Sequence, residues 1–166
     1  MTLIQELPTI TYVETRSVGH YPEWVRAITE AFSRLKPACR LHVWVPRDFQ
    51  ALHSSWAEGY FSSSEDAAVR ITCYDSLFKA THGTQREQSS ILELNVILRC
   101  AEADRARVCY IARLDGQLRN IALGRFNSMR AKLVGLLDQP YLHYGKIGNR
   151  KKQSRHKYVC LLRNSR

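Results

Sequence analysis

Residues 7–45, LPTITYVETRSVGHYPEWVRAITEAFSRLKPACRLHVWV, predict a strand, a helix and a second strand in succession. The first segment, Leu7–Val13, is rich in side chains that favour strands, and Cys39–Val45 alternates in the way a strand does. Between them, Pro22 and Glu23 suit the first turn of a helix, and Pro37 ends it. The apolar face of this helix consists of Trp24, Val25, Ile28, Ala31, Phe32 and Leu35. Because a whole helix separates the two strands, we expect them to pair in parallel.

The rest of the chain continues this alternation. Further strands are predicted at residues 69–74, 108–114 and 132–137, and helices at 48–60, 89–103 and 117–123, with a polar loop over 79–88. The order predicts an α/β fold: a doubly wound, mostly parallel, Rossmann-like sheet of about five strands with helices on both faces. We expect the strand order 3-2-1-4-5. Ligands of such sheets bind beyond the carboxyl ends of the strands at the topological switch, here the loops 14–20 and 115–116.

The positive charge of the chain is concentrated at one end. The net charge is +10, and residues 146–166 hold eight of the 25 Lys and Arg residues and no acid. The first 145 residues keep 17 basic against 15 acidic side chains, so they are close to neutral. We therefore divide the chain into a Rossmann-like domain, residues 1–145, and a basic C-terminal tail, residues 146–166.

Cysteine usage and hydropathy indicate a reducing, aqueous compartment. None of the five cysteines forms a C-x-x-C pair, so we expect small buried apolar side chains, with neither a disulfide framework nor a metal site. The N-terminal residues lack the basic and apolar regions of a signal peptide, and no apolar run is long enough to cross a bilayer. These features predict a cytoplasmic protein, with a position at a membrane face as an option.

Gly19 and His20 are the first candidate site residues, because they lie between the first strand and the first helix. Backbone N–H groups at a helix N-terminus bind anions, and glycine lets a ligand approach the main chain. A histidine there could contact a phosphate or act as a base. The alternative is an ordinary loop glycine followed by a histidine that caps the helix.

Asp115 is the second candidate, since it follows the fourth predicted strand. An acid in this position often meets a ligand, but Asp115-Gly116 is equally an ordinary turn that caps the next helix. Three other side chains favour packing over function: His42, Trp44 and Trp56.

The tail could bind RNA or anionic lipid, because phosphate contacts dominate such affinities. Its candidate contact residues are Lys146, Arg150, Lys151, Lys152, Arg155 and Lys157. The alternative is a solvated segment, or one that packs against a further domain.

Three segments carry a resemblance to a known family. They are VGHYPEWVRAI at residues 18–28, YIARLD at 110–115, and the run from Gly135 to Tyr144. Together they resemble the N-terminal domain of GT-B type, group-4-like glycosyltransferases.

The resemblance implies an enzyme that transfers a glycosyl unit from a nucleotide sugar to a glycan, lipid or small-molecule acceptor, with no cofactor. By this match the domain would hold the acceptor, and Gly19 and His20 would line the cleft near the donor phosphates. Such enzymes are about twice this length, and their second domain binds the nucleotide. The resemblance therefore implies an incomplete enzyme that is inactive alone: a truncated product, a split enzyme that awaits a partner, or a derived domain with another role. The alternative function is a non-enzymatic module that docks on RNA or anionic lipid through its basic tail.

Overall fold

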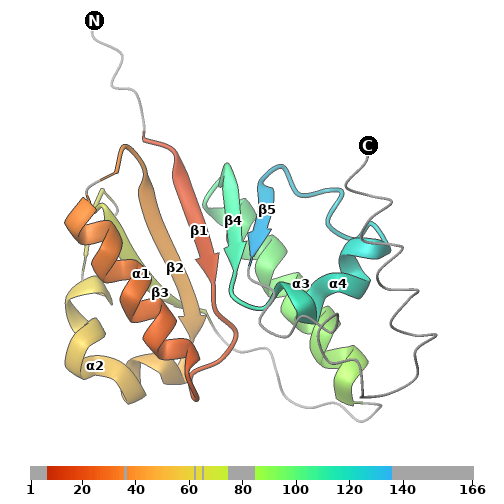
Figure 1. Ribbon diagram of the computed structural model, residues 1–166, viewed down its shortest axis with the longest axis horizontal. Helices are drawn as coiled ribbons and strands as arrows, with labels where there is room; N and C mark the ends of the chain where they lie inside the picture. The colour runs from red at the N-terminus through yellow and green to blue at the C-terminus, as the bar shows by residue number, and fades with distance from the viewer. Residues whose placement is uncertain (1–6, 36, 62, 65, 75–84, 136–166) are drawn as a thin grey trace, which may run out of the picture.

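The computed structural model describes residues 7–35, 37–61, 63–64, 66–74 and 85–135. Five strands and four helices alternate along these residues (Figure 1). The strands are β1 (Thr9–Val13), β2 (Arg40–Pro46), β3 (Val69–Tyr74), β4 (Val108–Ile111) and β5 (Lys132–Gly135). The helices are α1 (Tyr21–Leu35), α2 (Asp48–Phe61), α3 (Gln85–Ala103) and α4 (Leu114–Ala122).

All four strand pairs are parallel, and the order is β3-β2-β1-β4-β5. The predicted α/β fold with a Rossmann-like parallel sheet is therefore confirmed. Several boundaries differ from the predictions, with larger shifts at the start of α3 and between β4 and α4. Helix α3 begins at residue 85, within the predicted polar loop, because the first turn of a helix needs no apolar residue. Strand β4 ends at Ile111, and the predicted Asp115-Gly116 turn lies inside α4.

Helices α1 and α2 pack on one face of the β1–β3 half of the sheet (Figure 1). The core on this face joins alternate strand residues to the apolar sides of the two helices. Its fully buried members include Tyr12, Val43, Ile71, Val25 and Phe49.

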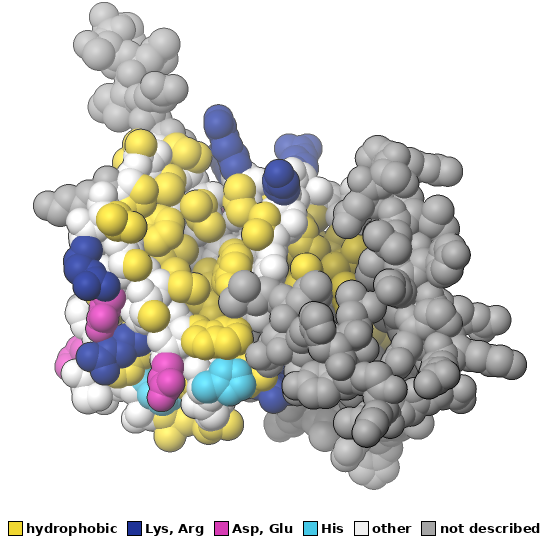
Figure 2. Space-filling view, in the orientation of Figure 1, with side chains coloured by type: hydrophobic (Ala, Val, Ile, Leu, Met, Phe, Trp, Pro, Cys, Tyr) yellow, Lys and Arg dark blue, Asp and Glu magenta, His cyan; other side chains and the backbone are white. Residues whose placement is uncertain are grey.

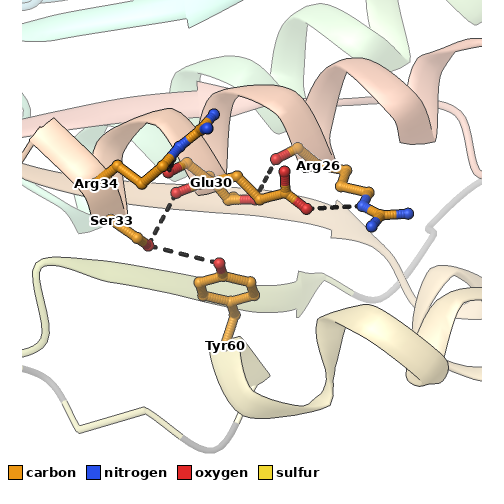
Figure 3. A network of polar contacts seen from close by, with 6 residues as sticks. Arg26, Glu30, Ser33, Arg34 and Tyr60 are labelled. Atoms are coloured by element: carbon orange, nitrogen blue, oxygen red, sulfur yellow. Dashed lines mark hydrogen bonds and ion pairs between the residues drawn. The ribbon is translucent and has the colours of Figure 1, made fainter.

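A polar contact also joins the two helices. Ser33 Oγ donates to the Thr29 carbonyl at 2.9 Å and lies 3.5 Å from the Tyr60 hydroxyl of α2 (Figure 3). On the exposed side of α1, Arg26 Nε pairs with Glu30 at 2.8 Å.

Helix α3 covers the opposite face, over β1 and β4. Its buried side chains Val96, Ile97 and Cys100 pack with Val13 and Ile111 in a second core cluster. The sheet is thus covered by helices on both faces, as the alternating pattern predicts.

A buried polar network lies beside this second cluster. The carboxylate of Asp104, which follows α3, meets His42 Nδ1 at 2.6 Å and accepts a hydrogen bond from Trp44 Nε1 at 2.9 Å. Thr11 donates to the same carboxylate, and His42 Nε2 lies 2.8 Å from the Thr72 hydroxyl. The side chains of His42 and Asp104 are each 5% exposed, so the prediction of a packed His42 agrees with the structure.

Candidate anion site at the carboxyl edge of the sheet

Strands β1 and β4 are neighbours at the centre of the sheet, and the chain leaves them toward opposite faces. After β1 it passes through residues 14–20 into α1, and after β4 it passes through Ala112 and Arg113 into α4. In Figure 1 this edge, where the arrowhead of β1 ends, is at the bottom of the molecule. Such a switch point is where α/β sheets place their ligands.

Gly19 turns the loop into α1. Its φ is +82°, a left-handed conformation that glycine adopts without strain, and a Cβ there would make an ordinary contact with the Tyr21 ring at 3.8 Å. The positive φ is the structural reason for a glycine at this position. The helix starts two residues later, so its N-terminal N–H groups lie at the switch point.

His20 is exposed and its ring is braced from two sides. The centroid of its imidazole lies 4.3 Å from that of Tyr21, with 30° between the planes, and 5.0 Å from that of Trp24. Figure 2 shows histidine side chains (cyan) at the lower edge of the molecule, where the strands end. This arrangement presents a supported flat ring at the surface of the site.

Two arginines from different loops flank Tyr21. The guanidinium carbon of Arg16 lies 5.2 Å from the centroid of the Tyr21 ring, and that of Arg113 lies 6.0 Å from it. Both distances fall within the range of cation–π contacts. Arg113 Nε is buried and has no hydrogen-bond partner among the described residues. The edge therefore combines two guanidinium groups with the positive end of α1.

Glu14 lies beneath this cationic pair and organises the loop after β1. The residue is 1% exposed. Its Oε1 accepts hydrogen bonds from the backbone N–H groups of Thr15 at 2.8 Å and Arg16 at 3.1 Å, and its Oε2 accepts one from the Tyr12 hydroxyl at 3.0 Å. Burial raises the pKa of Glu14 to about 7, although these hydrogen bonds lower it in part.

A small cavity connects Glu14 to the helices of the other face. It is lined by Glu14, Arg113, Glu93 and Gln117, among others. Gln117 Nε2 donates to Glu93 at 3.0 Å, and Asn120 Nδ2 donates to Gln117 at 2.7 Å, which ties α3 to α4. These hydrogen-bonded side chains, two amides and one carboxylate, form a polar surface beside Arg113.

A larger hollow lies at the opposite, amino edge of the sheet. Its lining includes Leu7, Pro37, Cys39, Tyr60 and Val69 and contains no charged side chain. Because this lining carries no charge, whereas the carboxyl edge holds two arginines, the candidate anion site is the carboxyl edge.

The structure brings only some of the predicted site residues together. Gly19 and His20 lie at the site, beside Arg16 and Arg113. Asp115 has its backbone in the first turn of α4, and the structure does not describe its side chain. The six tail candidates, from Lys146 to Lys157, fall outside the described residues.

Sequence reasoning missed Arg16 and Arg113 as site residues. The signal was their position, since each closely follows one of the two central strands. The sequence alone did not show that both guanidinium groups contact the Tyr21 ring, because this contact is made only in the folded chain.

Comparisons with known proteins give little to set beside this geometry. No family model matches the chain, and no curated protein matches it. A solved structure that is similar is the U34-tRNA thiolase NcsA from Methanococcus maripaludis with its [4Fe-4S] cluster, with a TM-score of 0.49 and 8% identity. The match covers 96% of this chain and 59% of that one. At this level of likeness we draw nothing about function from it.

The comparisons correct the resemblance predicted from the sequence. No family model and no curated protein matches the chain, so the assignment to GT-B glycosyltransferases is withdrawn. The prediction of glycosyl transfer from a nucleotide sugar is withdrawn as well, because the segments that suggested it are short and occur on a fold that hosts many functions. Gly19 is explained instead by its positive φ.

The sequence predicted no cofactor, whereas the similar solved structure contains a [4Fe-4S] cluster. The described residues do not fit such a cluster. Across residues 7–74 and 85–135, apart from the gaps given above, no group of three or more His, Cys, Asp or Glu side chains could hold a metal ion.

Among the helices that the structure describes, none is long and apolar enough to cross a membrane. The cytoplasmic compartment remains a prediction.

Proposed function

We propose that this protein is an RNA-binding α/β module whose carboxyl edge holds a phosphate of a single-stranded segment. The observation that carries the proposal is the pair Arg16 and Arg113, which flank the Tyr21 ring at the N-terminus of α1. No chemical step is part of the proposal.

The chemistry of this pair favours a phosphate. A guanidinium group offers several N–H donors in a planar fork that matches phosphate oxygens, and the positive end of a helix adds to the attraction. The Nε of Arg113 lacks a partner among the described residues, although it is buried. A buried donor without a partner is costly, so an acceptor that reaches it would bind favourably.

Two further features favour RNA over a free anion. The exposed His20 ring, braced by Tyr21 and Trp24, is a platform on which an unpaired base can stack. The eight Lys and Arg residues of the tail supply a second source of phosphate contacts on the same chain.

The test is the affinity of the full chain for a short fluorescein-labelled single-stranded RNA, measured by fluorescence anisotropy over a range of salt concentrations. The double variant Arg16→Gln/Arg113→Gln should bind about tenfold or more weakly. Its salt slope should fall, because each lost phosphate contact on a single strand reduces that slope by about 0.7.

Arg34→Gln is the matched control. It removes one positive charge from the opposite end of α1, where Arg34 Nε donates to the Glu30 carbonyl at 3.3 Å, and it should leave RNA affinity close to that of the wild type. Equal losses in the control and in the double variant would contradict a specific site. Binding to vesicles that contain phosphatidylserine, without binding to RNA, would replace the proposal with the lipid alternative.

A further inference from the structure

Glu14 is a buried acid at the carboxyl edge of the sheet. Its side chain contacts the loop after β1 and lies in the same part of the site as Arg16 and Arg113. We propose that Glu14 is the positioning residue of the anion site and that its protonation strengthens RNA binding, an inference that rests on the proposed function. As a carboxylate it holds the loop but places a negative charge under the guanidinium pair. As a neutral acid it keeps an acceptor for the loop and removes that charge.

The positioning role follows from four contacts on one residue. The side chain accepts the N–H groups of Thr15 and Arg16, which fixes the backbone that carries the Arg16 guanidinium. The main chain of Glu14 is fixed too: its N–H donates to the Trp44 carbonyl at 2.9 Å, and its carbonyl accepts the Tyr74 hydroxyl at 3.1 Å. Glu14 is therefore hydrogen-bonded to residues of both β2 and β3, and the start of the loop cannot move without breaking these buried hydrogen bonds.

The proton-linked role follows from the charged neighbours of Glu14. Arg16 interacts electrostatically with the carboxylate, and Arg113 lines the same cavity. A bound phosphate would compete with Glu14 for Arg16 and would lie near a second negative charge. Protonation of Glu14 removes that charge from the cavity that Arg113 also lines, and by linkage a bound phosphate makes Glu14 easier to protonate.

Other titratable groups lie around Glu14 and have contacts of their own. Burial raises the pKa of Tyr12, Tyr74 and Tyr110 above the ordinary tyrosine value, so these hydroxyls stay neutral near pH 7. Glu93 of α3 lines the cavity and accepts a hydrogen bond from Gln117. At the start of α2, Asp48 accepts a hydrogen bond from Ser17 at 2.6 Å. His20 lies at the rim of the site, so a His20 variant is included in the experiment.

The experiment measures affinity for the same labelled RNA from about pH 5.5 to about pH 8.5, and follows the backbone amides of Thr15 and Arg16 by NMR over that range. For the wild type we expect affinity to rise about fivefold or more as the pH falls, with both amide signals titrating. Glu14→Gln should bind at high pH as the wild type does at low pH, with flat amide signals. His20→Gln should keep most of the pH dependence.

Two more variants separate position from charge. Glu14→Ala loses the acceptor and should bind weakly at every pH, whereas the Gln variant restores binding. Glu30→Gln removes an exposed acid from α1 and should retain the wild-type pH profile, which controls for a general change in charge.

Two results would overturn the inference and leave the proposed function intact: RNA binding with the same pH dependence in Glu14→Gln, or wild-type amides that do not titrate. Absence of RNA binding by the wild type and by Glu14→Gln at every pH would instead reject the proposed function, and the inference with it.

Discussion

The carboxyl group of Glu14 lies inside the protein, and its environment opposes its charge. Three hydrogen bonds favour the carboxylate, but loss of water contact outweighs them, so the pKa rises from 4.5 to about 7. A raised pKa means that the folded protein binds this proton more tightly than the unfolded chain does. Stability from this group is fully present below about pH 4.5 and is lost as the pH rises through about 7.

We expect Glu14→Gln to remove this loss. At about pH 8 the variant should be more stable than the wild type by on the order of 3 kcal/mol, because the amide keeps the acceptor and carries no charge. Urea unfolding at a series of pH values measures the effect. Glu30→Gln, which alters a half-exposed acid, should follow the wild-type curve, and a wild-type slope in Glu14→Gln would contradict the prediction.

Gly19 can be tested through its backbone conformation. Gly19→Ala places a Cβ on a residue with a φ of +82° and should destabilise the protein by about 1 kcal/mol. Gly59→Ala is the matched control: Gly59 lies in α2 with nothing within 4 Å of a Cβ, and alanine there should stabilise the helix by about 0.5–1 kcal/mol. Opposite signs in thermal unfolding would confirm both assignments.

At the scale of elements, hydrogen bonds of Asp104 link the end of α3 to β1 and β2. Its carboxylate contacts side chains from β1 and β2, namely Thr11, His42 and Trp44. Because these partners come from strands far apart in the sequence from Asp104, the network stabilises the packing of α3 and not its formation.

Asp104→Ala should therefore destabilise the fold by about 3 kcal/mol, since it leaves buried donors without an acceptor. The control is Asp66→Ala. Asp66 pairs with Arg40 at 3.4 Å, but its side chain is 91% exposed, and its loss should cost less than about 0.5 kcal/mol. Chemical unfolding measures both variants, and similar small losses would show that the network contributes little.

At the scale of the whole molecule, charge is distributed unevenly along the sequence: residues 1–145 are close to neutral and residues 146–166 are basic. If both contact the same RNA, their contributions to affinity combine through one ligand. Deletion of residues 146–166 should lower the salt slope of RNA binding while the remaining binding still depends on Arg16 and Arg113. Anisotropy titrations of the truncated chain, with and without the double Arg→Gln change, test this. Complete loss of binding on deletion would assign recognition to the tail alone.

The order of strands and helices was determined by the sequence itself. Local periodicity fixed the apolar face of α1 and the alternation of β2, and the long connections required parallel pairing. The positions of Gly19 and His20 followed from the same pattern, because a strand, a turn and a helix in succession place that turn at the carboxyl edge of the sheet.

The chemistry of the site was decided only by the tertiary structure. Arg16 and Arg113 are far apart in the sequence and meet at Tyr21 because β1 and β4 are neighbours in the sheet. In the sequence Glu14 is one residue of the loop after the first strand, and only its burial and its hydrogen bonds to β2 and β3 raise its pKa to about 7. Sequence patterns report which face of an element is apolar, whereas the pKa of a group and the approach of two cations depend on solvent exclusion and on contacts between distant segments.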